Sequence, residues 1–169
     1  MDTRRYRSPV DDSELVYRTM LGEEQLYALH NWLSAVNSTA SFKFIITSVP
    51  FTSLWTHDAQ IDGWAAYPVE KASLLEAFHS VPNVILISGD RHEFAAIEFS
   101  SPSPSSHVVR ELSTSPLSMF YIPFYHTLKP QSVETFSRNV TGTDGNSTEV
   151  VEVPYEKAIK YIPHGNAKW

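Results

Sequence analysis

Residues 84–87 form a continuous apolar run, Val-Ile-Leu-Ile, and Ser-Gly-Asp-Arg-His-Glu follows it directly. A short apolar run without polar alternation is typical of a strand in the middle of an α/β sheet, covered on both faces. Upstream, residues 42–48 predict another buried strand, and Pro68 is well placed to open a helix between the two. The order strand, loop, helix, strand predicts a right-handed β-α-β unit with parallel strands.

The segments around this unit carry weaker signals. A helix is expected to start near Gly22, because apolar side chains recur at the spacing of one buried helical face: Leu26, Leu29, Leu33 and Val36. Residues 51–67 have no clear period and predict an ordered functional loop, in which Trp64 and Tyr67 are expected to pack. Residues 95–99 and 108–112 predict two strands of an outer hairpin. The chain turns polar from Thr127, and residues 141–147 predict an exposed turn.

The composition excludes several classes of protein. At 169 residues the chain fits one domain, which we assign to residues 1–169. A formal charge of −6 argues against a nucleic acid as structural partner, because a phosphate backbone selects a basic surface. No apolar run approaches the roughly 20 residues that span a bilayer. The absence of cysteine excludes disulfides and cysteine-metal sites, and nothing in the sequence predicts an oligomeric state.

Three N-glycosylation sequons begin at Asn37, Asn139 and Asn146. The stretch from Met1 to Leu26 is mostly polar and charged, so it lacks the apolar core of a secretory signal. The two observations fit together if the chain is part of a longer exported protein. A secreted, vacuolar or cell-surface parent is therefore the expected localisation.

The chemistry-bearing side chains follow the apolar run, where α/β sheets gather their ligands beyond the carboxyl ends of the strands. Gly89 is expected to allow a tight turn. Asp90 and His92, two residues apart in an extended turn, can offer one carboxylate oxygen and one imidazole nitrogen to iron, zinc or manganese. Arg91 or Glu93 could then orient these ligands. The alternative is structural: Asp90 caps the turn and His92 is an ordinary loop histidine.

The run from Asn83 to Glu93 resembles the late metal-binding block of the PhoD-like alkaline phosphatases, a branch of the calcineurin-type metallophosphoesterases. Other blocks match that family in the same order, so that the resemblance covers almost the whole chain. They are Asp2-Thr-Arg-Arg-Tyr-Arg, Met20-Leu-Gly-Glu-Glu-Gln-Leu, Ser48-Val-Pro-Phe with Asp62-Gly-Trp-Ala-Ala-Tyr-Pro, Glu111-Leu-Ser-Thr-Ser-Pro-Leu and Gly165-Asn-Ala-Lys-Trp.

The resemblance implies that Asp90 and His92 are metal ligands and catalytic residues. It implies hydrolysis of a phosphomonoester or phosphodiester by metal-activated water, with divalent or trivalent ions such as iron, calcium, zinc or manganese as cofactors. Four more residues become candidates for contacting substrate or orienting the ligands: Arg5, His57, Arg91 and Glu93. For Arg4 and Arg7 a solvated basic patch is the expected role.

The family's other metal ligands come from earlier blocks, and no equivalent lies upstream of Asp90 in this sequence. The resemblance therefore implies an α/β fold that is the second half of a four-layer αββα sandwich with a mixed sheet, without the N-terminal metal-binding half. The alternative function is a truncated, non-catalytic remnant or binding module. A third possibility is an unrelated α/β binding domain with a coincidental Gly-Asp-x-His.

Overall fold

A computed structural model describes residues 1–10, 14–114, 127–141 and 147–163. The predicted Gly165 block and an aromatic run at residues 121–125 lie outside this part of the chain. The elements, in order, are η1 (Leu15–Tyr17), α1 (Gly22–Val36), β1 (Lys43–Thr47), α2 (Ala59–Asp62), η2 (Trp64–Ala66), α3 (Pro68–His79), β2 (Val84–Ser88), β3 (Phe94–Phe99), β4 (Val109–Ser113), β5 (Thr135–Thr141), β6 (Thr148–Pro154) and β7 (Glu156–Ile162).

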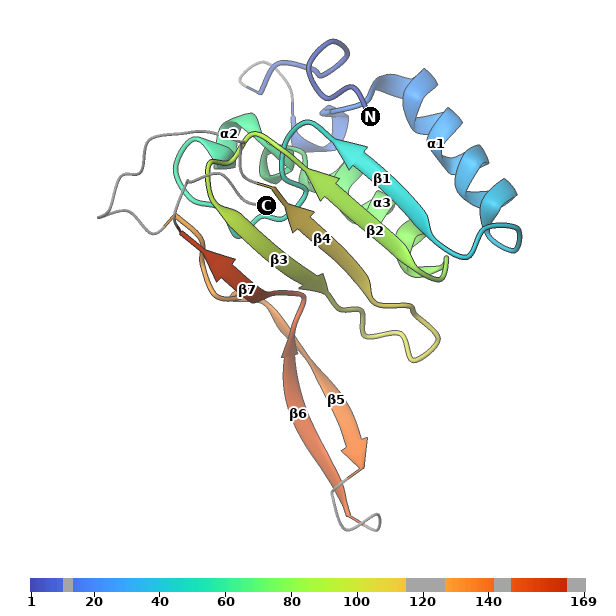
Figure 1. Ribbon diagram of the computed structural model, residues 1–169, viewed down its shortest axis with the longest axis vertical. Helices are drawn as coiled ribbons and strands as arrows, with labels where there is room; N and C mark the ends of the chain where they lie inside the picture. The colour runs from blue at the N-terminus through green and yellow to red at the C-terminus, as the bar shows by residue number, and fades with distance from the viewer. Residues whose placement is uncertain (11–13, 115–126, 142–146, 164–169) are drawn as a thin grey trace.

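A mixed five-stranded sheet in the order β1-β2-β4-β3-β7 organises the molecule (Figure 1). Strands β1, β2 and β4 run parallel, and β3 pairs antiparallel with both β4 and β7. The predicted unit of strand, helix and parallel strand is confirmed as β1, α3 and β2. The carboxyl ends of β1, β2 and β4 therefore meet at one edge of the sheet, where the candidate site lies.

One prediction about the later strands needs correction, and one element was not predicted. The hairpin of β3 and β4 exists, but it is not an outer hairpin, because β4 lies inside the sheet between β2 and β3. The polar region after Thr127 contains a two-stranded antiparallel ribbon, β5 with β6, which projects away from the sheet in Figure 1. The predicted turn at the tip of this ribbon lies mostly outside the described residues.

One face of the sheet is covered by helices: in Figure 1, α3 lies behind β1 and β2, and α1 lies to the side of β1. Strand residues that alternate inward form the core with side chains from the helices and from the loop after β1. Trp64 and Tyr67 are 0% and 1% exposed, as expected for packing residues. None of the helices in the described ranges is long and apolar enough to cross a membrane.

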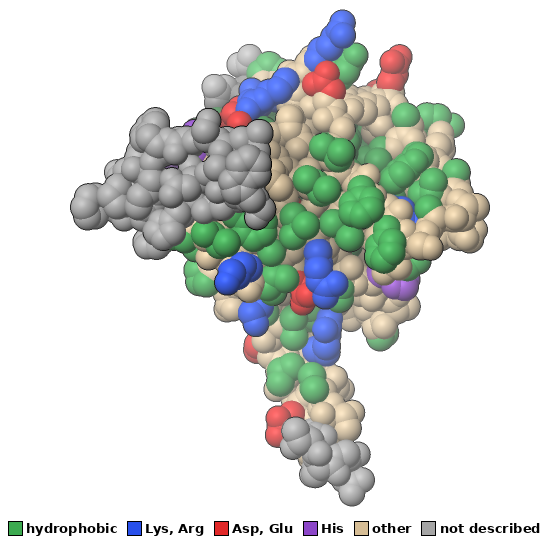
Figure 2. Space-filling model, viewed as in Figure 1, with side chains coloured by type: hydrophobic (Ala, Val, Ile, Leu, Met, Phe, Trp, Pro, Cys, Tyr) green, Lys and Arg blue, Asp and Glu red, His purple; other side chains and the backbone are tan. Residues whose placement is uncertain are grey.

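No segment in the described part of the chain covers the opposite face of the sheet. Phe44 and Ile46 of β1 are 56% and 64% exposed, and Leu112 of β4 is 38% exposed. Figure 2 shows hydrophobic side chains gathered on the face that looks toward the viewer. The prediction of strands covered on both faces is therefore wrong for this chain, because the helices cover only one face and no other described segment packs on the second.

A buried carboxylate fixes the start of α1. Glu70, in the first turn of α3, accepts hydrogen bonds from the backbone N–H groups of Met20 and Leu21 at 3.2 and 3.1 Å. Gly22 begins the helix at φ 71°, and a Cβ there would lie 3.2 Å from the Cβ of Tyr6. The hydrogen bonds from Met20 and Leu21 to Glu70 hold the start of α1 against α3. The close approach of Gly22 to Tyr6 places this start beside the N-terminal segment.

Candidate functional site

Asp90 lies on a strained turn directly after β2. Its φ of 75° falls in the left-handed region, and the N–H of Arg91 donates to the Gly89 carbonyl across it at 3.0 Å. The residue with positive φ is thus Asp90 and not Gly89, which corrects the expectation from sequence. Such a conformation costs about 1–3 kcal/mol and is concentrated at functional sites. It leaves the Asp90 side chain exposed at the carboxyl edge of the sheet.

A charge cluster surrounds the Asp90 carboxylate. Arg4 Nη2 lies 3.3 Å from Asp90 Oδ1, and Nη1 of the same guanidinium donates to the Asp62 carboxylate. Arg7 Nη1 also binds Asp62, at 2.8 Å to the carboxylate and 3.2 Å to the carbonyl oxygen. The hydrogen bond from Arg4, with a further one from Arg7, lowers the pKa of Asp62. Arg4 and Arg7 are therefore ion-paired and not a solvated patch.

Arg91 braces the turn from the other side. Its guanidinium stacks over the Trp55 ring at 5.3 Å and donates to Asp58 at 2.9 Å. Burial alone would raise the pKa of Asp58, but the hydrogen bond and the positive charge of Arg91 bring it below its ordinary value. The neighbouring His57 has a left-handed φ of 60° and an exposed side chain. Arg91 thus ties the loop after β1 to the turn that carries His92.

Glu93 turns away from the site edge into a hydrogen-bonded group. Tyr161 of β7 donates its hydroxyl to the Glu93 carboxylate, and Thr127 Oγ1 donates to the same oxygen at 3.1 Å. Burial, followed by the hydrogen bond with Glu93, raises the pKa of Tyr161. Glu93 therefore holds the end of the turn against β7, whereas the side chain of His92 is exposed.

The anchoring of the N-terminal segment places Arg4, and not Arg5, beside Asp90. The amide side chain of Gln25 binds the backbone of Asp2 twice, accepting at 2.6 Å and donating at 2.9 Å. Thr3 is fully buried and hydrogen-bonded to Ser48. Arg4 then reaches Asp90, whereas the Arg5 guanidinium stacks on Tyr6 at 5.5 Å.

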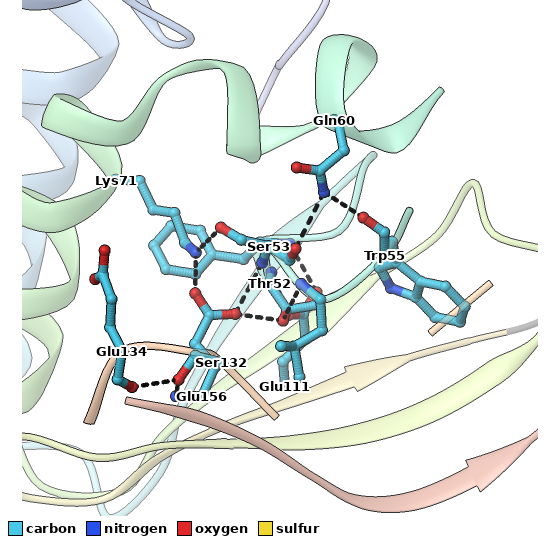
Figure 3. Close-up of polar contacts among 11 residues, drawn as sticks. Thr52, Ser53, Trp55, Gln60, Lys71, Glu111, Ser132, Glu134 and Glu156 are labelled. Carbon is cyan, nitrogen blue, oxygen red and sulfur yellow. Dashed lines mark hydrogen bonds and ion pairs between the residues drawn. The ribbon is translucent and has the colours of Figure 1, made fainter. Parts of the chain in front are cut away.

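A buried polar network lies behind the site, and sequence reasoning missed its role. Glu111 of β4 accepts hydrogen bonds from the N–H groups of Phe51 and Thr52, both at 2.8 Å, and from Ser88 Oγ at 2.6 Å. Figure 3 shows the Glu156 carboxylate beside it, bound by Lys71 and by the Thr52–Ser53 segment. Burial raises the pKa of Glu111, against these hydrogen bonds, which lower it.

One sequence signal could have placed Glu111 inside. In the run Val109-Arg-Glu-Leu-Ser113, the period of two puts Glu111 on the same face as Val109. A glutamate in the inward phase of a strand requires buried donors, because an unpaired buried carboxylate is costly. No comparable signal identifies the donors, which come from segments up to 60 residues earlier in the chain.

The described residues do not form a complete metal site. Within residues 1–10, 14–114, 127–141 and 147–163, no group of three or more His, Cys, Asp or Glu side chains is placed to hold a metal ion. A protein-bound metal of the expected kinds takes four or more ligands, with waters or substrate filling open positions. Asp90 and His92 offer two donors, and Asp90 already faces the Arg4 guanidinium. These residues fit a part of a metal site and not a whole one.

Comparison with known proteins agrees with the fold. The family model described as PhoD-like phosphatase matches residues 1–157. A solved structure titled "Structure of PhoD" is 27% identical, with a TM-score of 0.56 over 68% of this chain. No curated protein matches the sequence. The chain spans only 26% of that PhoD chain. Because the family model covers most of the sequence, this chain belongs to the PhoD-like phosphatase family.

Proposed function

We propose that this chain supplies Asp90 and His92 to a metal-dependent site that hydrolyses phosphate monoesters or diesters. The carrying observation is the strained turn after β2, which presents an exposed aspartate and an exposed histidine two residues apart at the carboxyl edge of the sheet. Strain that is retained at an exposed acidic residue supports a functional role over a structural one. Membership of the PhoD-like family supports the reaction class.

The remaining ligands of this site come, in our proposal, from polypeptide that packs on the uncovered face of the sheet. That face carries Phe44, Ile46 and Leu112 in contact with solvent, and apolar patches of this kind mark binding surfaces.

The ion pairs of Arg4 with Asp62 and Asp90 affect how readily a metal ion can bind the Asp90 carboxylate. Two guanidinium groups, from Arg4 and Arg7, face two carboxylates, from Asp62 and Asp90, so the charges of the cluster balance. A cation that binds Asp90 must compete with Arg4 for that carboxylate. Arg4, once released from Asp90, remains held by Asp62 at the edge where an anionic phosphate ester would lie.

Hydrolysis of a generic aryl phosphate and a bis-aryl phosphate tests this proposal. The purified chain is assayed with iron, calcium, zinc or manganese, beside Asp90→Asn and His92→Ala. Asparagine tolerates the left-handed conformation, so Asp90→Asn removes the charge and leaves the turn. Turnover that needs metal and disappears in both variants supports the proposal. Turnover that persists in both variants contradicts the assignment of these residues.

The second candidate is a non-catalytic binding module. It is favoured by the two-donor arrangement at Asp90 and His92 within the described residues. Metal bound through Asp90 and His92, without turnover of either ester by the chain or by its assembly with the polypeptide that completes the site, would select this candidate over the enzyme.

We also propose an exported parent protein. Asn37, which follows α1, and Asn139 on β5 both have exposed side chains, so a glycan could be attached to each in the folded chain. Expression through a secretory route followed by glycosidase treatment tests this: a fall in mass supports export, and an unchanged mass contradicts it.

A further inference from the structure

Two separate loops carry the side chains of the candidate site. The loop after β1 holds His57 and Asp58, and the turn after β2 holds Asp90 and His92. The ladder between β1 and β2 ends at the pair Thr47 and Ser88, before either loop begins. Any geometry that the site needs between the loops must therefore be fixed by side chains beyond the end of the ladder.

Besides Arg4 and Arg91, which link the two loops at the surface, the buried side chain of Glu111 joins the first loop to Ser88, the last residue of β2. Its Oε1 accepts from the Phe51 N–H in the first loop at 2.8 Å and from Ser88 Oγ, one residue before the Gly89 turn, at 2.6 Å. Its Oε2 accepts from the Thr52 N–H at 2.8 Å. The residue is 0% exposed, so water does not compete for these bonds. One carboxylate thus joins the first loop to the end of β2.

Glu156 is the natural comparison, because it is also a buried glutamate in the same network. It accepts from Thr52 Oγ1 at 2.5 Å, from the Ser53 N–H at 2.8 Å and from Lys71. All these donors belong to the first loop or to α3 (Figure 3). Glu156 fixes the first loop in place, but within the described residues its carboxylate makes no hydrogen bond to the β2 turn.

The serines at the ends of β2 and β4 supply a matched pair. Ser88 and Ser113 face each other in the ladder, and both are 1% exposed or less. The Ser88 hydroxyl donates to Glu111, whereas the Ser113 hydroxyl is buried without a hydrogen-bond partner in the described part of the chain. The two positions differ in their link to Glu111 and share the same burial.

We infer that Glu111 is a positioning residue for the candidate metal site, and that it acts on the Asp90 turn through Ser88. The inference rests on the proposed function, because it assumes that Asp90 and His92 bind the metal. Removing a residue that orients metal ligands without binding the metal itself typically weakens metal affinity about tenfold to a hundredfold. Glu111 reaches the ligands through the backbone of residues 88–90, so we expect the lower end of that range, about tenfold.

The first test compares Ser88→Ala with Ser113→Ala by two-dimensional NMR and Mn²⁺ titration. We expect Ser88→Ala to shift the backbone amide signals of residues 89–93 and to weaken Mn²⁺ affinity about tenfold. Ser113→Ala should leave both unchanged. Equal effects of the two variants, or unchanged signals at residues 89–93 in Ser88→Ala, would overturn the inference.

The second test separates positioning from general destabilisation. Glu111→Gln and Glu156→Gln each weaken the buried network, but only Glu111→Gln is expected to move the amide signals of residues 89–93. A shift of this turn in both variants would show a purely structural network and overturn the inference.

The amide signals also separate this inference from the proposed function. If Mn²⁺ does not bind at Asp90 and His92 in the unmodified chain, the proposed function fails. The amide shifts still decide whether Glu111 sets the turn through Ser88.

Discussion

The two faces of the five-stranded sheet both carry apolar side chains, but these are buried on one face and exposed on the other. On the covered face, Ile45 and Leu86 are 3% and 0% exposed, and they pack against helices. On the other face, Phe44 and Ile46 alternate with Ile45 along β1 and remain exposed. Both faces are apolar, but only one has its partner among the described residues.

The face that packs against the helices stabilises the fold, whereas the exposed apolar face is available to bind another surface. Burial of apolar side chains contributes about 25 cal/mol per Å², and that gain is realised on the helix side alone. An uncovered apolar face contributes nothing to the fold until another surface packs on it. The candidate site lies at the edge between these two faces.

The largest expected effect is on the covered side, at the buried ion pair. Lys71 and Glu156 have side chains only 8% and 10% exposed. Lys71→Met leaves the Glu156 carboxylate buried without its cation, so we expect a loss of about 3–5 kcal/mol in the free energy of unfolding. Urea denaturation measures it. A loss below about 1 kcal/mol would show that the pair is solvated.

The next effect contrasts two neighbours on β2. Leu86 faces the helices at 0% exposure, whereas Ile87 lies on the uncovered face and is partly exposed. We expect Leu86→Ala to cost about 2–5 kcal/mol, because it leaves a cavity in the core. Ile87→Ala should cost less than half as much. Similar losses in urea denaturation would mean that both faces are covered in solution.

A smaller effect on stability, with a larger one on association, is expected for the uncovered face. Phe44→Ser with Ile46→Ser should change the unfolding free energy by less than about 1 kcal/mol, because both side chains are exposed. The double variant should reduce self-association measured by sedimentation velocity. Self-association that the double variant leaves unchanged would contradict the assignment of this face as the associating surface.

The smallest effect concerns acid stability at the site edge. The Asp62 carboxyl has a pKa below its ordinary value of 3.8, chiefly because of the hydrogen bond from Arg4. Its contribution is therefore present above about pH 3.8 and is lost as pH falls through the lower folded-state pKa. Asp62→Asn should flatten the pH dependence of the melting temperature in this range. An unchanged acid limb would show that the pairing is weak in solution.

Much of the fold could be predicted from local pattern, and the parallel unit of β1, α3 and β2 is the clearest case. The apolar strands also misled, because Phe42-Lys-Phe-Ile-Ile predicts burial on both faces. The lysine in that run turns inward together with Ile45: Lys43 is 1% exposed and donates to the carbonyls of Asn37 and Pro82 at 3.0 and 3.1 Å. Periodicity alone could not show which face the helices would cover.

The site was only partly predictable for a different reason. Asp90 and His92 lie in one short motif, so their common position follows from the strand before them. The contact of Arg4 with Asp90 joins residues 86 positions apart. The link from Glu111 to Ser88 also depends on strand order, because β4 must lie next to β2. Such contacts follow from topology, which local patterns do not determine.

The most direct test of the central claim is where Mn²⁺ binds on the chain. Paramagnetic broadening of the NMR signals is followed in the unmodified chain, Asp90→Asn, His92→Ala and the control His107→Ala, whose exposed histidine lies on the β3–β4 loop. We expect broadening centred on residues 89–93, retained in His107→Ala and lost in the two site variants. Broadening that persists in Asp90→Asn and His92→Ala would contradict it.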